Sequence, residues 1–312
     1  TVKNLILNVL KNPFNMVVLV SLIILFCLII IPLLTMISST FTLAQGELRR
    51  VQGHVGDFTL YYWKYILTGT MANAVLWGPL KNSFVCGFFT VLVSVPLGSV
   101  LAWLMIRTDI PGKKILGLLV TVPYMIPSWT KALAWLAMFR NSTSGANGFL
   151  AGMGIPVPDW LAYGPIAIVL CMSMHYYAFS YIMVSGALRS INSELEEMGE
   201  IQGASKAQIL RHITLPLILP SVLSATVMTI SKSIGTYGVP ANLGNRIGYY
   251  TLATKMRNFI DQGPQSVGYA MSIVLVLLAA LIIFSNQRIV GVRKSYATVS
   301  GKGGRATLMP LG

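Results

Sequence analysis

The sequence contains six apolar stretches that are long enough to cross a lipid bilayer as helices. A transmembrane helix needs about 20 mostly apolar residues to span about 30 Å of hydrocarbon. The predicted spans are Phe14 to Met36, Phe84 to Ile106, Ile115 to Phe139, Pro165 to Leu188, Leu215 to Tyr237 and Val267 to Phe284. Their residues do not alternate between apolar and polar, so a membrane β-barrel is excluded. We expect an all-α, polytopic transmembrane helix bundle that occupies residues 1–312 as a single domain.

Composition supports a membrane protein. Hydrophobic residues make up 54% of the chain and charged residues only 10%, whereas soluble proteins carry about 25% charged residues. The formal net charge of +14 does not indicate nucleic-acid binding, because the basic residues lie at the ends of apolar stretches and not in a basic helix or patch. With the N-terminus inside, 13 of the 23 Lys and Arg residues fall in inside segments and 8 in outside segments. The positive-inside rule therefore predicts that both termini are cytoplasmic.

Several other segments have simple interpretations. Cys27, Cys86 and Cys171 lie in apolar stretches, and we expect them to be buried as small hydrophobic side chains. The first apolar stretch is too long for a signal-peptide core, so we expect it to be retained. Because the sequence opens at Thr1 without a methionine, we expect it to be an excerpt.

The segments outside the spans also carry predictions. In the outer segment from Phe41 to Leu80, clustered aromatic residues at positions 61–65 favour an interfacial anchor over a ligand-stacking site. Residues 288–312 form the predicted cytoplasmic tail. Its run Ser300 to Arg305 is typical of a flexible linker, and it lacks the spacing of a phosphate-binding loop.

Prolines and lysines interrupt two of the predicted spans. They are Pro123, Pro127 and Lys131 in the third span, and Pro216, Pro220 and Lys232 in the fifth. Proline lacks the N–H group that continues a helix, so these spans should be kinked or packed inward, where the freed backbone groups find partners. Interruptions of this kind are typical of helices that line a pathway.

The segment from Ser193 to Pro216 combines many charges with helix signals, and it falls on the predicted cytoplasmic side. Two capping-box patterns, Ser193 with Glu196 and Ser205 with Gln208, predict two short helices. Each helix has a narrow apolar edge, formed by Leu195, Met198 and Ile201 in the first and by Ile209, Leu210 and Ile213 in the second. Such a unit can insert into a groove on a partner protein or lie on its own membrane surface, and these local patterns leave both alternatives open.

The residues of this loop resemble a motif of transport proteins. Glu197-Met-Gly-Glu-Ile-Gln-Gly203, followed after nine residues by Ile213-Thr-Leu-Pro216, is similar to the Glu-Ala-Ala motif of type I ABC importer permeases, with Met198-Gly199 in place of the two alanines. In that family the loop seats in the ATPase subunit. The resemblance therefore implies the following ATPase contacts: Glu197, Met198, Gly199, Gly203, Ala204, Ile213, Leu215 and Pro216.

The likeness covers about residues 80–284, including Arg107-Thr-Asp-Ile-Pro-Gly112 and Gly235-Thr-Tyr-Gly-Val-Pro240. It is greatest to permeases of the iron(III), phosphonate and polyamine branch. The resemblance implies a bacterial inner-membrane transport subunit that is not an enzyme and binds no cofactor itself, with ATP and Mg bound in partner ATPase subunits. It also implies an extracytoplasmic solute-binding protein and a second permease subunit. In some permeases of this branch the second subunit is a fused half, joined by a tail such as Gly301 to Arg305.

Lysines inside a span mark a candidate pathway, because burying one costs about 2.5 to 3.5 kcal/mol. The predicted pathway residues are Lys131, Lys232, Ser128, Ser231, Ser233, Tyr237 and His175. A snorkelling or ion-paired structural role for the lysines stays open, and a satisfied core histidine is the simpler interpretation of His175. No acidic residue lies deep in a predicted span, so the field favours an anion such as a phosphonate, a phosphorylated solute or an anionic iron(III) complex. A polyamine is the alternative substrate.

Two other classes of function fit the sequence less well. A secondary transporter or channel should show inverted repeats or broken helices in both halves of the chain, and the sequence shows no such repeat. An intramembrane enzyme needs a nucleophile with a base, a carboxylate pair or a metal site, and His175 alone supplies none of these.

Overall fold

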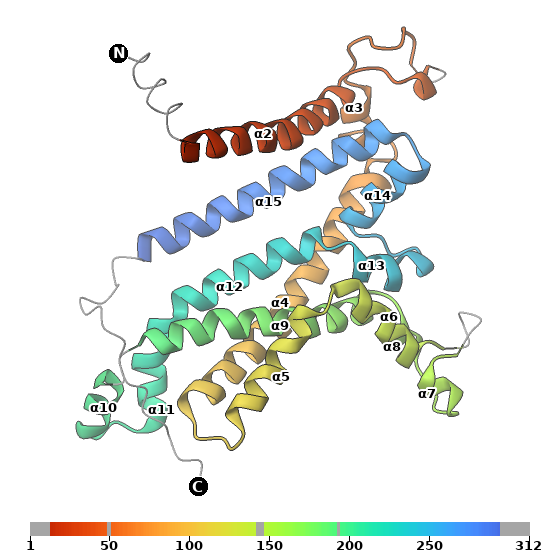
Figure 1. The fold of residues 1–312 in the computed structure, drawn as a ribbon. Coiled ribbons are helices and arrows are strands. Elements are labelled where there is room, and N and C mark those ends of the chain that lie inside the picture. The colour runs from red at the N-terminus through yellow and green to blue at the C-terminus, as the bar shows by residue number, and fades with distance from the viewer. Residues whose placement is uncertain (1–12, 49–50, 142–146, 192–193, 294–312) are drawn as a thin grey trace, which may run out of the picture. The chain divides into compact units, whose positions relative to one another are not determined.

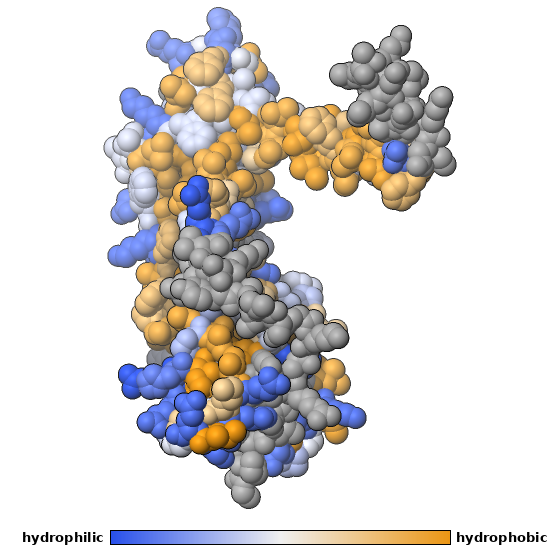
Figure 2. Space-filling model, turned by 90° about the vertical axis from the view of Figure 1, so that its left-hand side faces the viewer, coloured by the Kyte–Doolittle hydropathy of each residue, from blue (hydrophilic) through white to orange (hydrophobic). Residues whose placement is uncertain are grey.

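The computed structural model describes residues 13–48, 51–141, 147–191 and 194–293. Within these ranges the chain is helical, and its strand-like pairing is limited to one bridge between Thr42 and Phe58. The all-α transmembrane prediction is confirmed. Figure 2 shows broad hydrophobic areas on the surface that it presents, as expected of helices that face lipid. By length and composition, the following helical stretches can cross a membrane: Phe14–Ser39, Asn73–Arg107, Asp159–Ser190, Lys206–Gly235 and Gln265–Arg288.

The chain forms two compact units, and the first comprises Thr1–Ala72 with Met256–Ile273. Its elements are α2 (Pro13–Ser39), η1 (Gln45–Glu47) and α3 (Tyr61–Leu67). Tyr62 is fully buried, and its hydroxyl accepts a hydrogen bond from the Ala44 N–H at 3.0 Å. Trp63 stacks on Phe41 and donates to Thr40 Oγ1 at 3.3 Å. Tyr62 is therefore a core residue of this unit, and its prediction as an interfacial anchor is wrong.

The second unit comprises Asn73–Lys255 with Val274–Gly312. Its helices, in chain order, are η2 (Asn73–Trp77), α4 (Gly78–Arg107), α5 (Lys113–Met125), α6 (Ser128–Phe139), α7 (Phe149–Gly152), α8 (Asp159–Ala162), α9 (Pro165–Ser190), α10 (Glu194–Ile201), α11 (Lys206–Ile209), η4 (Leu210–Thr214), α12 (Leu215–Gly235), α13 (Gly238–Leu243) and η5 (Asn245–Ile247). Two more helices, α14 (Leu252–Gln262) and α15 (Gln265–Arg293), belong partly to each unit.

Helices α4 and α9 form the centre of the second unit, and α12 packs against both (Figure 1). Gly98 of α4 makes the close approach to α9 possible. A Cβ atom at this position would lie 2.7 Å from Ser180 Cβ and 2.8 Å from the Tyr181 nitrogen. Small residues at helix crossings are the usual means of close packing in membranes, where no hydrophobic effect drives the helices together.

The third predicted span is not one helix, because α5 ends at Met125 and α6 begins at Ser128. Pro127 has no N–H to offer the carbonyl of Pro123, which lies four residues earlier. His175 of α9 forms a hydrogen bond with that carbonyl instead. The Ile126 carbonyl accepts a hydrogen bond from Lys131 Nζ at 2.9 Å. In the third span the freed backbone groups thus have partners, as predicted, with a complete break in place of a kink.

Two other helix boundaries differ from the sequence predictions. The second span starts earlier than predicted, because η2 and α4 form one helical stretch from Asn73 to Arg107. The second short helix of the charged loop is continuous with the fifth span, from Lys206 to Gly235. The capping box of Ser205 and Gln208 is confirmed. The other predicted capping residue, Ser193, lies outside the described residues.

The α4–α9 crossing should be sensitive to one added methyl group. We expect Gly98→Ala to destabilise the protein by about 1–3 kcal/mol, because the new Cβ would overlap the α9 backbone. Gly87→Ala on the same helix is the matched control, since its Cβ would lie at an ordinary 3.6 Å from Ile234 and Ser233. Thermal unfolding of the two purified variants in detergent measures the difference. Equal melting temperatures would contradict this account of the crossing.

Candidate functional site

Four helices bring three of the predicted pathway residues together around the ring of Tyr124. Tyr124 of α5 stacks on His175 of α9, with ring centroids 5.3 Å apart. Lys232 of α12 donates to the Tyr124 hydroxyl at 3.3 Å, and its Nζ lies 4.8 Å from the centroid of the Phe179 ring. Lys131 of α6 contacts His175 Nδ1. We call Tyr124, Lys131, His175, Phe179 and Lys232 the cation cluster.

The two lysines of the cation cluster have different roles. Lys131 is held by the Ile126 carbonyl and by His175. An ammonium group can only donate, so His175 Nδ1 is the acceptor in its contact with Lys131. Lys131 therefore satisfies a carbonyl group at the break between α5 and α6. Lys232 is exposed and has Tyr124 as its hydrogen-bond partner, which leaves its ammonium group accessible to a solute.

The electrostatics of the cation cluster favour negative charge. In the described part of the chain, neither lysine forms an ion pair with a carboxylate. The rings of Tyr124 and Phe179 present π faces to Lys232, which attract a cation without neutralising it. Two positive groups therefore lie close together without a compensating acid, and such an arrangement attracts anions and repels polyamines.

The remaining predicted pathway residues lie elsewhere. Ser233 is buried and faces α4, where a Cβ on Gly87 would lie 3.6 Å from Ser233 Cβ. Ser231 is half-buried one position before Lys232, Ser128 is half-buried at the start of α6, and Tyr237 is exposed just before α13. Sequence analysis missed Tyr124 and Phe179, although Tyr124 follows Pro123 and Phe179 lies one helical turn after His175.

The loop between α9 and α12 has an inner and an outer side. Ile209 is buried, and Gly199 lies against Ile209 and Ile213, since a Cβ there would be 3.2 and 3.1 Å from their side chains. Met198 and Ile201 are exposed on the outer side, Ile201 by 85%. Because Gly199 has no Cβ, α10 can pack closely on the start of the fifth span. The opposite side of α10 keeps an exposed apolar edge.

The predicted ATPase contacts divide between these two sides. Exposed positions are Glu197, Met198, Gly203, Leu215 and Pro216. Half-buried positions are Gly199, Ala204 and Ile213. Gly203 lies in the turn after α10 with a φ of +84°, a backbone conformation that glycine adopts without strain. Gly199 and Ile213 therefore belong to the internal packing of the loop.

A buried ion pair connects this loop to the end of α4. Arg107 Nε lies 3.4 Å from Glu196 Oε2, and the two side chains are 1% and 7% exposed. The other carboxylate oxygen of Glu196 accepts a hydrogen bond from Thr214 Oγ1 at 2.7 Å. Three segments that are distant in sequence thus meet at one carboxylate. The ends of α4 and α9, α10 and the start of the fifth span lie at one end of the second unit, which we call the α10 end.

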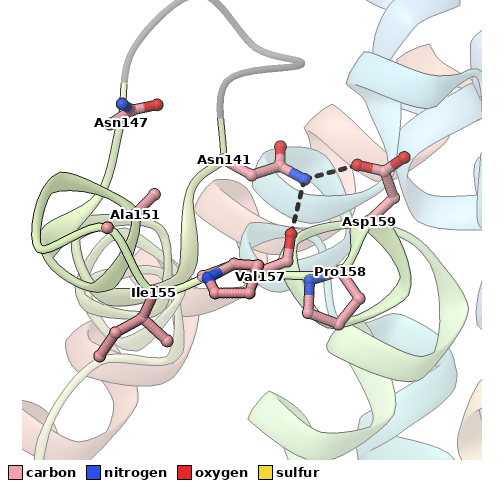
Figure 3. Close-up of a pocket in the computed structure, with 9 residues that line it drawn as sticks. Asn141, Asn147, Ala151, Ile155, Val157, Pro158 and Asp159 are labelled. Atoms are coloured by element: carbon pink, nitrogen blue, oxygen red, sulfur yellow. Dashed lines mark hydrogen bonds between the residues drawn. The ribbon is translucent and has the colours of Figure 1, made fainter.

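A pocket of about 420 Å³ lies on the segment between α6 and α8 (Figure 3). Asn141 donates from Nδ2 to the Val157 carbonyl at 3.2 Å and to Asp159 Oδ1 at 2.5 Å. Figure 3 shows Asn141 and Asp159 pointing toward each other. These bonds hold the connection before α9 in place. None of the cation-cluster residues lines this pocket.

Comparison with known proteins agrees with the predicted resemblance. The model of a family described as "Binding-protein-dependent transport system inner membrane component" matches residues 94–295. The putative 2-aminoethylphosphonate transport system permease protein PhnV of Salmonella typhimurium is 28% identical over 232 residues, 74% of this chain and 80% of the relative. The probable sulfate transport system permease protein cysT of Marchantia polymorpha is 25% identical over 241 residues, 74% of this chain and 81% of the relative.

Two solved structures show the same fold. A bacterial ABC transporter involved in the import of the acidic polysaccharide alginate matches with a TM-score of 0.68 and 18% identity, over 95% of this chain and 100% of the other. The inward-facing MetNI methionine ABC transporter matches with a TM-score of 0.53 and 24% identity, over 70% of this chain and 94% of the other.

The ion pair at the α10 end should make a large contribution to stability. We expect Glu196→Gln to destabilise the protein by about 3–5 kcal/mol, because Arg107 would remain buried without a counter-charge. Glu200→Gln, at an exposed position of the same helix, should change stability by less than about 0.5 kcal/mol. Thermal unfolding in detergent compares the two. If both variants have the melting temperature of the wild type, the Arg107–Glu196 pair does not stabilise the loop.

Proposed function

Because this chain belongs to the family of binding-protein-dependent transport system inner membrane components, the permease subunits of ABC importers, we propose that it forms part of the pathway for a small oxyanion. The observation that carries this proposal is the cation cluster, in which Lys232 is exposed beside Lys131 and no carboxylate of the described residues pairs with either. A field of this sign lowers the energy of an anion in the membrane and raises that of a cation.

The substrate class follows from the charge and from the relatives. One relative is named as a 2-aminoethylphosphonate permease and another as a sulfate permease, and both compounds carry a tetrahedral oxyanion group. We propose a substrate of this chemistry, either phosphonate, sulfate or a phosphorylated small molecule. An anionic iron(III) complex fits the same field, whereas a polyamine would be repelled by the two lysines.

The α10 end is proposed to face the cytoplasm and to dock on an ABC ATPase subunit. Arg107, Lys113, Lys114, Arg189, Lys206 and Arg211 are all placed at this end of the second unit by the elements that carry them, and the positive-inside rule assigns such an end to the cytoplasm. The exposed apolar edge of α10 supplies the surface for a groove on the partner. ATP and Mg would bind in that subunit.

The remaining partners follow from the family. A solute-binding protein would deliver the anion on the side opposite to α10. A second permease subunit would complete the pathway, as a separate chain or as a fused half joined through residues 288–312. The tail after residue 293 lies outside the described residues, so this connection rests on the sequence alone.

Docking should depend on the backbone of Gly203. We expect Gly203→Val to lower ATPase association at least about fivefold, because a β-branched residue at φ +84° costs about 1–3 kcal/mol and redirects the turn. Gly203→Asn should retain more binding, since asparagine tolerates this conformation. Co-purification of the ATPase and its transport-coupled hydrolysis give the measurement. If Gly203→Val shows wild-type ATPase association and hydrolysis, the turn at Gly203 is not part of the docking surface.

Transport should depend on the charge of Lys232. We expect Lys232→Met to reduce uptake of the oxyanion about tenfold or more while the complex still assembles, because the variant keeps the apolar stem and loses the exposed charge. Lys232→Arg should retain more transport. Lys131→Met should instead reduce the amount of folded protein, because Lys131 satisfies the Ile126 carbonyl. Uptake per assembled complex is the measurement, and equal uptake by wild type and Lys232→Met would contradict the proposal.

A further inference from the structure

A basic pocket of about 570 Å³ lies at the α10 end, between α4, α5 and α9. Its lining residues are Met105, Ile106, Lys113, Lys114, Gly117, Thr121, Tyr181, Ile182, Ser185, Gly186 and Arg189. Three of these side chains are cationic and none is acidic. The volume is in the range of pockets that bind small molecules, about 300–1,000 Å³.

Two polar side chains of α9 in the wall of this pocket are almost fully buried, and the hydroxyl of one of them lacks a partner. Tyr181 and Ser185 of α9 are each 6% exposed. Ser185 Oγ has no hydrogen-bond partner in the described part of the chain, and the Tyr181 hydroxyl lies in the same wall opposite Gly117. Buried hydroxyls in proteins are nearly always bonded. An unbonded buried donor beside three cations therefore indicates a ligand that accepts hydrogen bonds and carries negative charge.

The first turn of α5 adds to the same field. Lys113 and Lys114 begin this helix, and Gly117, one turn later, lies beside the Tyr181 hydroxyl, which a Cβ there would meet at an ordinary 3.6 Å. The N-terminus of a helix carries a partial positive charge and favours anions. The two lysine charges, the helix N-terminus and the hydroxyl groups thus all favour an anion in this pocket.

The pocket continues the face of the helices that carries the cation cluster. On α9 the positions of His175, Phe179, Ile182, Gly186 and Arg189 follow the spacing of one helix face. On α5, Gly117, Thr121 and Tyr124 do the same. The 14 residues from His175 to Arg189 correspond to about 21 Å along the helix. The pocket therefore lies farther toward the α10 end on the side where Lys232 is found.

We propose that this pocket is a second anion site, which binds a tetrahedral oxyanion group through Lys113, Lys114 and Arg189 and through the hydroxyls of Tyr181 and Ser185. The group can come from a free sulfate, phosphate or phosphonate ion, or from the phosphate of a lipid headgroup, since basic pockets at the ends of transmembrane helices bind such headgroups. The site is separate from Lys232 and does not depend on the proposed substrate.

Binding of inorganic sulfate and phosphate to the full chain in nanodiscs tests the site. The measurements use the Lys232→Met background, so that the cation cluster contributes little to binding and a failure of the transport proposal leaves this test unaffected. One set of nanodiscs contains only zwitterionic lipid, and the other contains anionic phosphatidylglycerol with no added salt anion. Isothermal titration measures ion binding, and native mass spectrometry measures retained lipid.

The variants separate charge from hydrogen bonding. Neutralising Lys113, Lys114 and Arg189 to Gln should weaken binding at least about tenfold, and Tyr181→Phe with Ser185→Ala should weaken it about three- to tenfold. The control changes Lys64, Lys206 and Arg211 to Gln, removing three charges outside the pocket, and should weaken binding less than about twofold. Circular dichroism and size exclusion confirm that each variant is folded.

The two arms identify the source of the oxyanion group. Pocket-dependent binding of sulfate or phosphate in zwitterionic lipid indicates a free ion. Pocket-dependent retention of phosphatidylglycerol without ion binding indicates a lipid headgroup. The proposal is overturned if neither arm shows binding, or if the pocket variants and the control lose binding equally.

Discussion

Every backbone N–H and C=O group within a bilayer must find its partner inside the protein, and this constraint shapes the second unit most clearly where the helix breaks at Pro127. Without a donor at position 127, the Pro123 carbonyl bonds His175, and the Ile126 carbonyl bonds Lys131. The break therefore fixes a histidine of α9 and a lysine of α6 beside the end of α5. Tyr124 then lies against His175 and reaches Lys232, so the cation cluster is a consequence of satisfying the broken helix.

The α10 end obeys a related constraint, because a buried charge must be compensated. Glu196 pairs with Arg107 of α4 and accepts from Thr214 at the start of the fifth span. A displacement of α10 by a partner must either move the end of α4 or separate a buried pair, which is costly. A movement of the loop that keeps the pair intact would therefore also move α4, which packs against α9 and α12 and is one wall of the basic pocket.

The sequence was sufficient for those features that follow from local patterns. Long apolar stretches predicted the membrane helices, and Ser205 with Gln208 predicted a capping box that the structure contains. The lysines of the third and fifth spans and His175 of the fourth identified the spans that form the cation cluster. Family resemblance identified the loop that ends at Pro216, and the family match agrees with it.

Features that depend on distant contacts were not predictable in this way. A proline is compatible with either a kink or a break in a helix. Here the helix breaks, and His175 and Lys131 bond the carbonyl groups that the break leaves free. Ser231, Lys232 and Ser233 are adjacent in sequence, but a helix turns about 100° per residue, so Ser233 faces α4 while Lys232 does not. Gly199 occupies a motif position that suggested a partner contact, and the packing of Ile209 and Ile213 places it inside the loop.

Site-directed cross-linking from α10 tests the central claim most directly, namely that the outer edge of this helix is the docking surface for an ATPase subunit. The chain would carry one cysteine, Ile201→Cys or Ile209→Cys, after replacement of Cys27, Cys86 and Cys171, and a short bifunctional reagent would be added to the assembled complex. Ile201 is 85% exposed and Ile209 1%. The account predicts a cross-link to the ATPase from position 201 and little from position 209. Absence of the product at position 201 in an active complex, or equal yields from both positions, would contradict it.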